Sequence, residues 1–340
     1  MWKILTIRMR PAAPFSIGPG WRLGFVMLTR LDAPPRTLWG AFTDAMTRSI
    51  QAGEMHFGPE IGPDENPFVR VGQWIEENMR FLPGVIKAVN EECADRLLPW
   101  YAFGKGAGFL LHGGGNIDEK HAFRTEAEAR RLFVHGKTGA ALDYNSLAAE
   151  ESMLHETERI HPEVRMVDGS VRPVWLETAA LVKQDQADLI KSWLVDKGAA
   201  YLRIGRDTAC GDGCFSEIRV DETTSTDELN MRLGLNNEQK IEWIPDQGDG
   251  LRVRVEPTNR AVRLPGPVLI APHTQHPSGY WGDLRPHIVR EYDLKKGFGR
   301  RTGFTAAPRG ILHYGGLLAV KGESRFRLER DGWVLEEHDA

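Results

Sequence analysis

The stretch YLRIGRDTACGDGCFSEIRV, residues 201–220, decides the fold that this sequence predicts. Three glycines fall in one loop between two runs with strand-like alternation: Gly205, Gly211 and Gly213. Glycine is favoured where the backbone takes a positive φ or approaches a ligand closely. Such a loop can present main-chain N–H groups to phosphate, and Arg203 and Arg206 add charged donors. The segment is therefore either a phosphate- or RNA-binding loop or a glycine-rich strand connection.

The elements before this loop predict an α+β fold. Alternating runs indicate strands at 3–10, 23–29, 152–160, 174–182, 200–204 and 214–220. Apolar residues at helical spacing predict a helix over 37–50, capped by Thr37, and another over 185–197, capped by Asp185. In chain order these elements match a ferredoxin-like, RRM-like βαββαβ unit with additions.

Two regions fall outside that unit. Residues 53–135 are less regular, with helices expected near 73–81, 85–98 and 126–132, and predict a large insertion. Beyond the polar run DETTSTDE the chain is β-rich, with strands expected at 251–256, 267–271 and 311–320 and a hairpin over 325–336. We therefore expect an N-terminal domain over 1–224, containing the insertion, and a β-rich C-terminal lobe over 225–340.

Composition limits the class of protein. The chain has 340 residues, 41% hydrophobic and 26% charged, which is typical of a globular protein, and no apolar run long enough to span a membrane. The N-terminus is typical of a strand and not of a signal peptide. Three cysteines form no disulfide framework or zinc motif and predict a reducing cytoplasm. A net charge of −4 disfavours a free-standing nucleic-acid binder but permits a subunit with one basic groove.

A second segment, KKGFGRRTG at 295–303, joins cations, glycines and one aromatic ring. Cations supply the salt-dependent attraction to phosphate, and an aromatic ring can stack on a base. The segment is either an RNA contact or a solvated basic loop. The residues that would make the contact are Lys295, Lys296, Gly297, Phe298, Gly299, Arg300 and Arg301.

No cofactor or metal site is expected. Gly136–Lys137–Thr138 resembles the end of a Walker A loop, but the upstream position where that motif requires glycine is occupied by Arg131. The glycines at 297 and 299 do not complete a dinucleotide fingerprint, because the third position is Thr302. The acidic residues show no metal-ligand spacing. His273 and His276 are either an acid–base pair or ordinary loop histidines.

Three segments resemble the RAMP superfamily of CRISPR–Cas effector subunits. PPRTLWGAFTDAM at 34–46 is similar to the superfamily's first-helix segment, and GKTGAALDYNSLAAEESMLHETERI at 136–160 is similar to the stretch that leads into a later strand. IGRDTACGDGCFSEI at 204–218 is similar to its glycine-rich loop of form G-x(5)-G-x-G. The resemblance covers about residues 1–220. It is greatest to the subunit that caps the 5′ end of the guide RNA in type III and related type III-D-like and type VII complexes.

The resemblance implies a non-catalytic RNA-binding subunit with two lobes. It would cap the 5′ handle of the crRNA and contact the first backbone subunit, and its neighbours could include a nuclease subunit. No cofactor and no membrane partner are implied. The RNA-binding residues expected, besides 295–301, are Arg36, Lys137, Arg203, Gly205, Arg206, Gly211 and Gly213.

Two other functions fit the same resemblance. The chain could be a metal-independent endoribonuclease that processes guide precursors with a histidine such as His273 or His276. It could also be a backbone subunit that polymerises along the guide and cleaves target RNA near Asp143. RNA cleavage separates the first from a cap, and copy number per complex separates the second.

Overall fold

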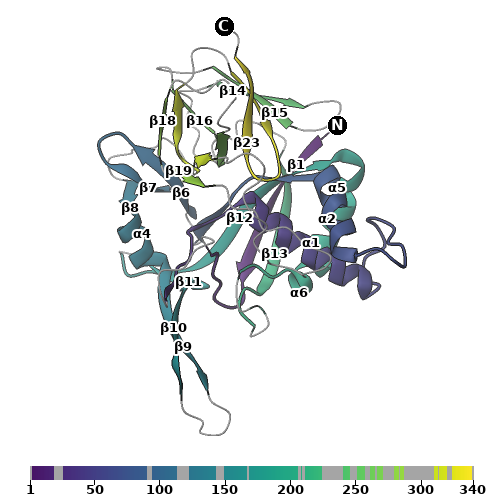
Figure 1. Cartoon of the computed structure of the whole chain (residues 1–340), viewed down its shortest axis with the longest axis horizontal. Coiled ribbons are helices and arrows are strands. Elements are labelled where there is room, and N and C mark those ends of the chain that lie inside the picture. Colours follow the sequence, from purple (N-terminus) through teal and green to yellow (C-terminus); the bar gives the residue numbers. More distant parts are fainter. Residues whose placement is uncertain are drawn as a thin grey trace.

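The structure is a computed structural model with a mixed α/β fold dominated by antiparallel sheets (Figure 1). The expectation of a mixed α and β architecture is therefore confirmed. The predicted domain boundary at 224/225 lies beside a stretch that is not described. The described residues are 2–18, 26–89, 94–112, 122–142, 149–166, 168–205, 208, 211–223, 240–245, 251–256, 261–264, 266–270, 279–282, 284–286, 310–312, 314–319 and 324–338.

A ten-stranded antiparallel sheet forms the centre of the molecule, in the order β13-β1-β12-β5-β6-β7-β8, with β3, β4 and β11 paired at its side. The register pairs Leu5 of β1 with Ala180 of β12 and Ile7 of β1 with Val220 of β13. Because successive side chains of a strand point to opposite faces, Leu5 and Ile7 lie on the same face of the sheet. The strands are β1 (Trp2–Pro11), β3 (Asp32–Ala33), β4 (Met79–Phe81), β5 (Gly84–Val89), β6 (Ala94–Ala102), β7 (Gly106–His112), β8 (Phe123–Thr125), β11 (Glu163–Arg165), β12 (Val171–Lys183) and β13 (Phe215–Thr223).

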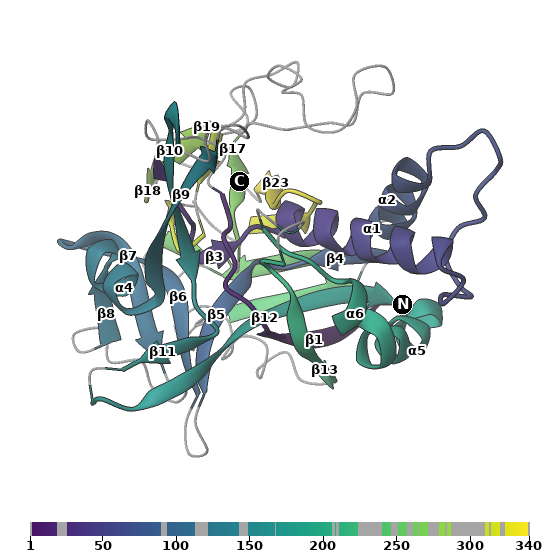
Figure 2. The ribbon, with the colours of Figure 1, turned by 90° about the horizontal axis from the view of Figure 1, so that it is seen from below.

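Helices cover one face of this sheet. Figure 2 shows α1, α2, α5 and α6 gathered at one side of the molecule, with α4 at the other. Leu38 and Phe42 of α1 are fully buried in the same core as Ile7 of β1. This face is apolar because the helical stripe and the alternate strand residues meet there. The helices are α1 (Pro35–Gln51), α2 (Pro67–Asn78), α5 (Gln184–Trp193), the π-helical turn η1 (Leu194–Gly198) and α6 (Ala199–Tyr201).

The opposite face packs against the C-terminal strands, which lie above the central sheet in Figure 1. Ala179 and Leu181 of β12 share a second core with Val253 and the fully buried Trp333. The predicted β-rich C-terminal region is confirmed in its described parts. Its strands are β14 (Lys240–Pro245), β15 (Leu251–Glu256), β16 (Ala261–Arg263), β17 (Val268–Ile270), β18 (Gly279–Trp281), β19 (Leu284–Pro286), β20 (Gly310–Leu312), β21 (Leu317–Ala319), β22 (Ser324–Leu328) and β23 (Trp333–His338).

A two-stranded arm extends away from the body of the molecule in Figure 1. It consists of β9 (Val134–Leu142) and β10 (Ala149–Ile160), and the short β2 (Val26–Met27) pairs with β10 at its base. Helix α4 (Glu126–Phe133) leads directly into β9 and begins with a capping box between Thr125 and Glu128. The arm therefore follows a helix whose N-terminal N–H groups are capped.

Several expected elements are wrong. The helix expected over 85–98 is replaced by β5 and part of β6, because its residues are buried on both faces of the central sheet and such strands show no alternation. The helix expected at 73–81 is α2, which begins earlier and ends at Asn78, before β4. The strand expected at 200–204 is helical up to Tyr201. Part of the expected insertion thus belongs to the central sheet.

Helix starts also differ from expectation. Pro34 and not Thr37 is the N-cap of α1, because the fixed φ of Pro35 suits the first helical position. Lys183 precedes α5, and Asp185 lies in its first turn. Of the strand expected at 23–29, only β2 is assigned, and 19–25 lie outside the described residues. No helix within the described ranges is long and apolar enough to cross a membrane.

Candidate nucleic-acid interface

The glycine loop connects α6 to β13, and two of its glycines serve tight backbone packing. Gly205 has φ +108°, and a Cβ there would lie 2.2 Å from the carbonyl oxygen of Ser16. Gly213 has φ +69°, and a Cβ there would lie 2.1 Å from the carbonyl oxygen of Ile204. Gly211, at φ +92°, would meet nothing within 4 Å. Only Gly211 therefore lies beside the open space that a ligand backbone needs.

The loop is held by residues 12–17, which run between it and the arm. The amide of Gly213 donates to the Pro14 carbonyl at 3.0 Å, and that of Ala12 donates to the Cys214 carbonyl at 2.8 Å. Phe15 and Ile160 exchange two backbone hydrogen bonds of 3.0 and 2.8 Å. The loop and the arm base are thus parts of one hydrogen-bonded assembly.

A buried ion pair reinforces the same junction. Arg159 Nη1 of β10 lies 2.6 Å from Asp212 Oδ2 of the loop, and both side chains are largely buried. Asp212 is therefore engaged with the protein itself. Because Arg159 neutralises the Asp212 carboxylate, Asp212 adds no net negative charge to the loop.

The other expected RNA contacts are dispersed. Arg203 donates to the Leu202 carbonyl at 2.8 Å, at the end of α6. Arg36 pairs with Asp331 at 3.1 Å and so ties α1 to the turn between β22 and β23. Lys137 is exposed on the arm and has no ion-pair partner within the described parts of the chain. Arg206 and 295–301 lie outside the described residues, as do His273, His276 and Asp143.

A pair of histidines at the arm base was not predicted. The rings of His135 in β9 and His161 after β10 lie 4.7 Å apart, centroid to centroid. Burial lowers the pKa of His161, and the neighbouring His135 and Arg159 lower it further. The cross-strand pairing of β9 with β10 brings the two histidines together, and their separation in the sequence gives no sign of it.

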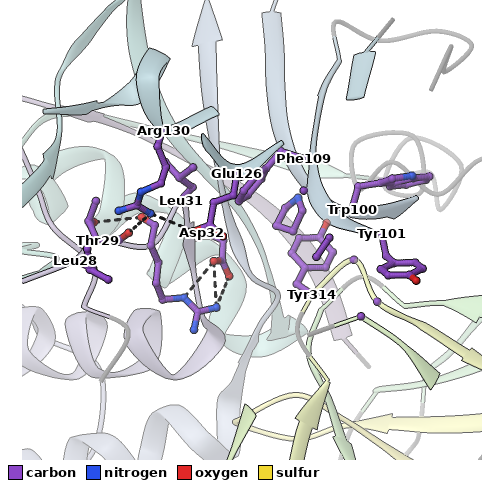
Figure 3. A pocket seen from close by; sticks show the side chains of 17 residues that line it. Leu28, Thr29, Leu31, Asp32, Trp100, Tyr101, Phe109, Glu126, Arg130 and Tyr314 are labelled. Atoms are coloured by element: carbon purple, nitrogen blue, oxygen red, sulfur yellow. Dashed lines mark hydrogen bonds and ion pairs between the residues drawn. The ribbon is translucent and has the colours of Figure 1, made fainter. Parts of the chain in front are cut away.

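The sequence also gave no indication of a pocket of about 380 Å³ at the junction of α4, the β6–β7 hairpin and the C-terminal region (Figure 3). Arg30 binds Asp32 through contacts of 2.9, 3.1 and 3.2 Å, and Arg130 donates to the Thr29 carbonyl at 2.9 Å. Arg130 also pairs with Glu158 of β10. The aromatic residues of the pocket lining are Trp100, Tyr101, Phe109 and Tyr314.

The polar groups of this pocket are mutually paired in the structure. Burial raises the pKa of the Tyr314 hydroxyl, and the nearby Asp32 carboxylate raises it further. Tyr314 therefore stays protonated and can donate. No group of three or more histidine, cysteine or acidic side chains suited to a metal ion occurs among the described residues.

Comparisons with known proteins bear on the fold. No protein-family model and no curated protein matches this chain. A chain in the cryo-EM structure of the type III-B Cmr-beta complex bound to cognate target RNA and AMPPnP is similar with a TM-score of 0.50 and 10% identity, covering 93% of this chain and 86% of that one. A chain in the Cmr-beta complex bound to cognate target RNA has a TM-score of 0.47 and 11% identity, with the same coverage. The first likeness shows that the chain shares the fold of a Cmr-beta component.

Proposed function

We propose that this chain is a guide-RNA-binding subunit of a type III-like CRISPR effector complex, and that it caps the 5′ handle of the crRNA. The observation that carries the proposal is the fold likeness over 93% of the chain to a component of the Cmr-beta complex, which was solved with its target RNA. The resemblance of 34–46, 136–160 and 204–218 to RAMP segments is independent support, because it comes from the sequence.

The proposal includes a ferredoxin-like core. In chain order β1, α1, β4, β12, α5 and β13 give βαββαβ, and their strands lie in the order β13-β1-β12-β4 with antiparallel pairing. This arrangement supports a RAMP domain in which β2, β3 and β5–β11 are additions. The C-terminal strands would then be the second lobe, with the boundary at 224/225.

The junction of the glycine loop and the arm is the proposed RNA-facing surface. Gly211 supplies an open, side-chain-free position, and Lys137 supplies an exposed cation on the arm. The basic residues of 295–301 would add cations from the second lobe. Arg36 and Arg203 would act indirectly, because the structure pairs them with protein groups.

The test is isolation of the native assembly through a tag on this chain. We expect RNA to co-purify, one copy of the chain per particle by native mass spectrometry, and ultraviolet cross-links confined to the 5′-terminal nucleotides. Several copies per particle would instead indicate a backbone subunit. An assembly free of RNA, or cross-links spread along the guide, would overturn the capping role.

One observation favours a second candidate, a metal-independent endoribonuclease. The His135–His161 pair lies beside Arg159, and a lowered pKa keeps His161 neutral and able to accept a proton from a 2′-hydroxyl. Attack of that oxygen on the adjacent phosphate would break the bond from phosphorus to the 5′ oxygen and give a 2′,3′-cyclic phosphate, and the leaving 5′ oxygen would take a proton from water to become a free hydroxyl. Cleavage of a repeat-hairpin RNA in EDTA that His161→Ala abolishes would establish this activity, and intact RNA would exclude it.

A further inference from the structure

Exposed aromatic rings lie next to the pocket of Figure 3. Phe103, in the β6–β7 turn, is 65% exposed, and Trp281, at the end of β18, is 37% exposed. Their ring centroids lie 5.6 Å apart, edge to face. Phe103 also contacts Tyr101 at 5.8 Å, and Tyr101 lines the pocket. The three rings therefore lead from the surface to the pocket mouth.

The lining of the pocket is that of a site for a flat polar ligand. Tyr101 and Phe109 provide aromatic surface. Arg30 and Asp32 bind each other, whereas the Glu126 side chain is 62% exposed and, although 3.4 Å from Arg130, keeps carboxylate lone pairs that can accept hydrogen bonds from a ligand. The charges of Arg30 and Arg130 are balanced by those of Asp32 and Glu126, so the wall offers no net positive charge to a phosphate. A nucleobase presents donors and acceptors on its edge and an apolar face, so it matches both kinds of lining.

The pocket wall and the glycine loop each form an ion pair with one of two neighbouring residues of strand β10. Arg130 of the pocket wall pairs with Glu158, and the next residue, Arg159, pairs with Asp212 of the loop. Strand β10 therefore connects the two places.

We propose that the Phe103–Trp281 rings and the pocket bind an unpaired nucleobase of single-stranded RNA, the rings by stacking and the pocket by hydrogen bonds to the base edge. The proposal extends the function proposed above and rests on it in requiring an RNA partner. Stacking needs rings with exposed faces and tolerates any base, whereas the polar wall discriminates between bases.

The experiment measures binding of fluorescein-labelled eight-nucleotide RNAs, oligo(A) and oligo(U), to the full chain by anisotropy, with an RNA duplex as comparison. Phe103→Ala and Trp281→Ala should each weaken single-strand binding about fivefold or more. Phe103→Tyr and Trp281→Phe should restore it, because both keep a ring. Glu126→Gln should change the ratio of oligo(A) to oligo(U) affinity, because it replaces an acceptor by a donor and acceptor.

Leu189→Ala is the matched control, since Leu189 is an exposed apolar residue of α5, away from the pocket. Wild-type affinity in both alanine variants, with native circular dichroism, would overturn the inference, as would absence of single-strand binding by the wild-type chain. Loss of a co-purifying protein subunit at unchanged RNA affinity would also overturn it and identify the rings as a protein contact. Failure of the capping role alone would give a different result. The cross-links in the native assembly would then miss the 5′ end of the RNA, while the Phe103 and Trp281 alanine variants would still bind single-stranded RNA more weakly than the wild-type chain.

Discussion

Arg159 and Asp212 form an ion pair of 2.6 Å with side-chain exposures of only 10% and 13%. Arg159 belongs to the base of the arm, and Asp212 belongs to the glycine loop. Removing two charges from water is costly, and the pair is retained only because each neutralises the other. The ion pair therefore ties the glycine loop to the base of the arm, in addition to the backbone hydrogen bonds from residues 12–17.

Breaking this pair should cost more than breaking an exposed one. Arg159→Ala leaves the Asp212 carboxylate buried without its partner and should lower the free energy of unfolding by about 3 kcal/mol. Arg219→Ala is the control, because the Arg219–Glu217 pair is exposed and should contribute less than about 1 kcal/mol. Urea unfolding midpoints measure both. Equal small losses would mean that Arg159 and Asp212 do not hold the loop.

The three loop glycines should respond unequally to alanine. Gly213→Ala places a Cβ 2.1 Å from a backbone oxygen at positive φ, so a clash adds to the penalty of its φ and the loss of stability should exceed about 2 kcal/mol. Gly211→Ala meets no neighbour and carries only the penalty of its φ, about 1–2 kcal/mol. Thermal unfolding should therefore rank Gly213→Ala as the less stable. The reverse order would contradict the packing of the loop against 12–17.

Local pattern was enough to predict the elements that bury one face. The alternation of β1 and the helical spacing of Leu38, Phe42 and Met46 predicted the first strand and helix, because each has one apolar and one polar side. Strand β5 has no exposed side, because Ile86 lies in the core beneath the helices, Val85 lies in a separate core on the other face, and Lys87 is buried too, so periodicity misassigned it. Tyr201 continues a π-helical turn that no propensity indicates.

The candidate site was predicted only in its local part. The glycine loop was found because its turns need positive φ and glycine is the residue that adopts it. Its packing against Ser16 and its pairing with Arg159 are long-range contacts that no spacing encodes. The pocket joins Asp32, Arg130 and Tyr314 from three distant segments, so it exists only after the lobes pack together.

A buried charge cluster on the central sheet makes Glu177 sensitive to substitution and pH. Lys87 Nζ donates to Glu177 Oε2 at 2.9 Å, and Arg96 Nε donates to Oε1 at 2.7 Å. Burial alone would raise the pKa of Glu177, but the Arg96 and Lys87 cations outweigh it and lower the pKa. Glu177→Gln leaves two cations without a counter-charge and should cost about 3 kcal/mol or more in urea unfolding.

The pH dependence follows from the sign of that shift. Because the folded pKa of Glu177 lies below its ordinary value of 4.5, its contribution is fully present above pH 4.5 and is lost as the pH falls through the folded value. The stability difference between wild type and Glu177→Gln should therefore be constant from pH 7 to 5 and shrink below it. Glu222→Gln is the control at an exposed pair. A difference that grows on acidification would show that the cluster is not held by the carboxylate.

The basic segment should set the salt dependence of RNA binding. Each phosphate contact releases counterions, and for single strands it adds about 0.7 to the slope of log K against log salt. Replacing Lys295, Lys296, Arg300 and Arg301 by alanine should therefore flatten the slope by up to about 3, with affinity falling most at low salt. Lys183→Ala with Lys191→Ala, at the start of α5 and within it, removes cations from the helical layer and should leave the slope unchanged.

Stacking by Phe103 and Trp281 carries no charge, so their alanine variants should lower affinity at every salt concentration without changing the slope. Titrations from 50 to 500 mM salt separate the two contributions, and an unchanged slope in the fourfold variant would place the phosphate contacts elsewhere on the chain.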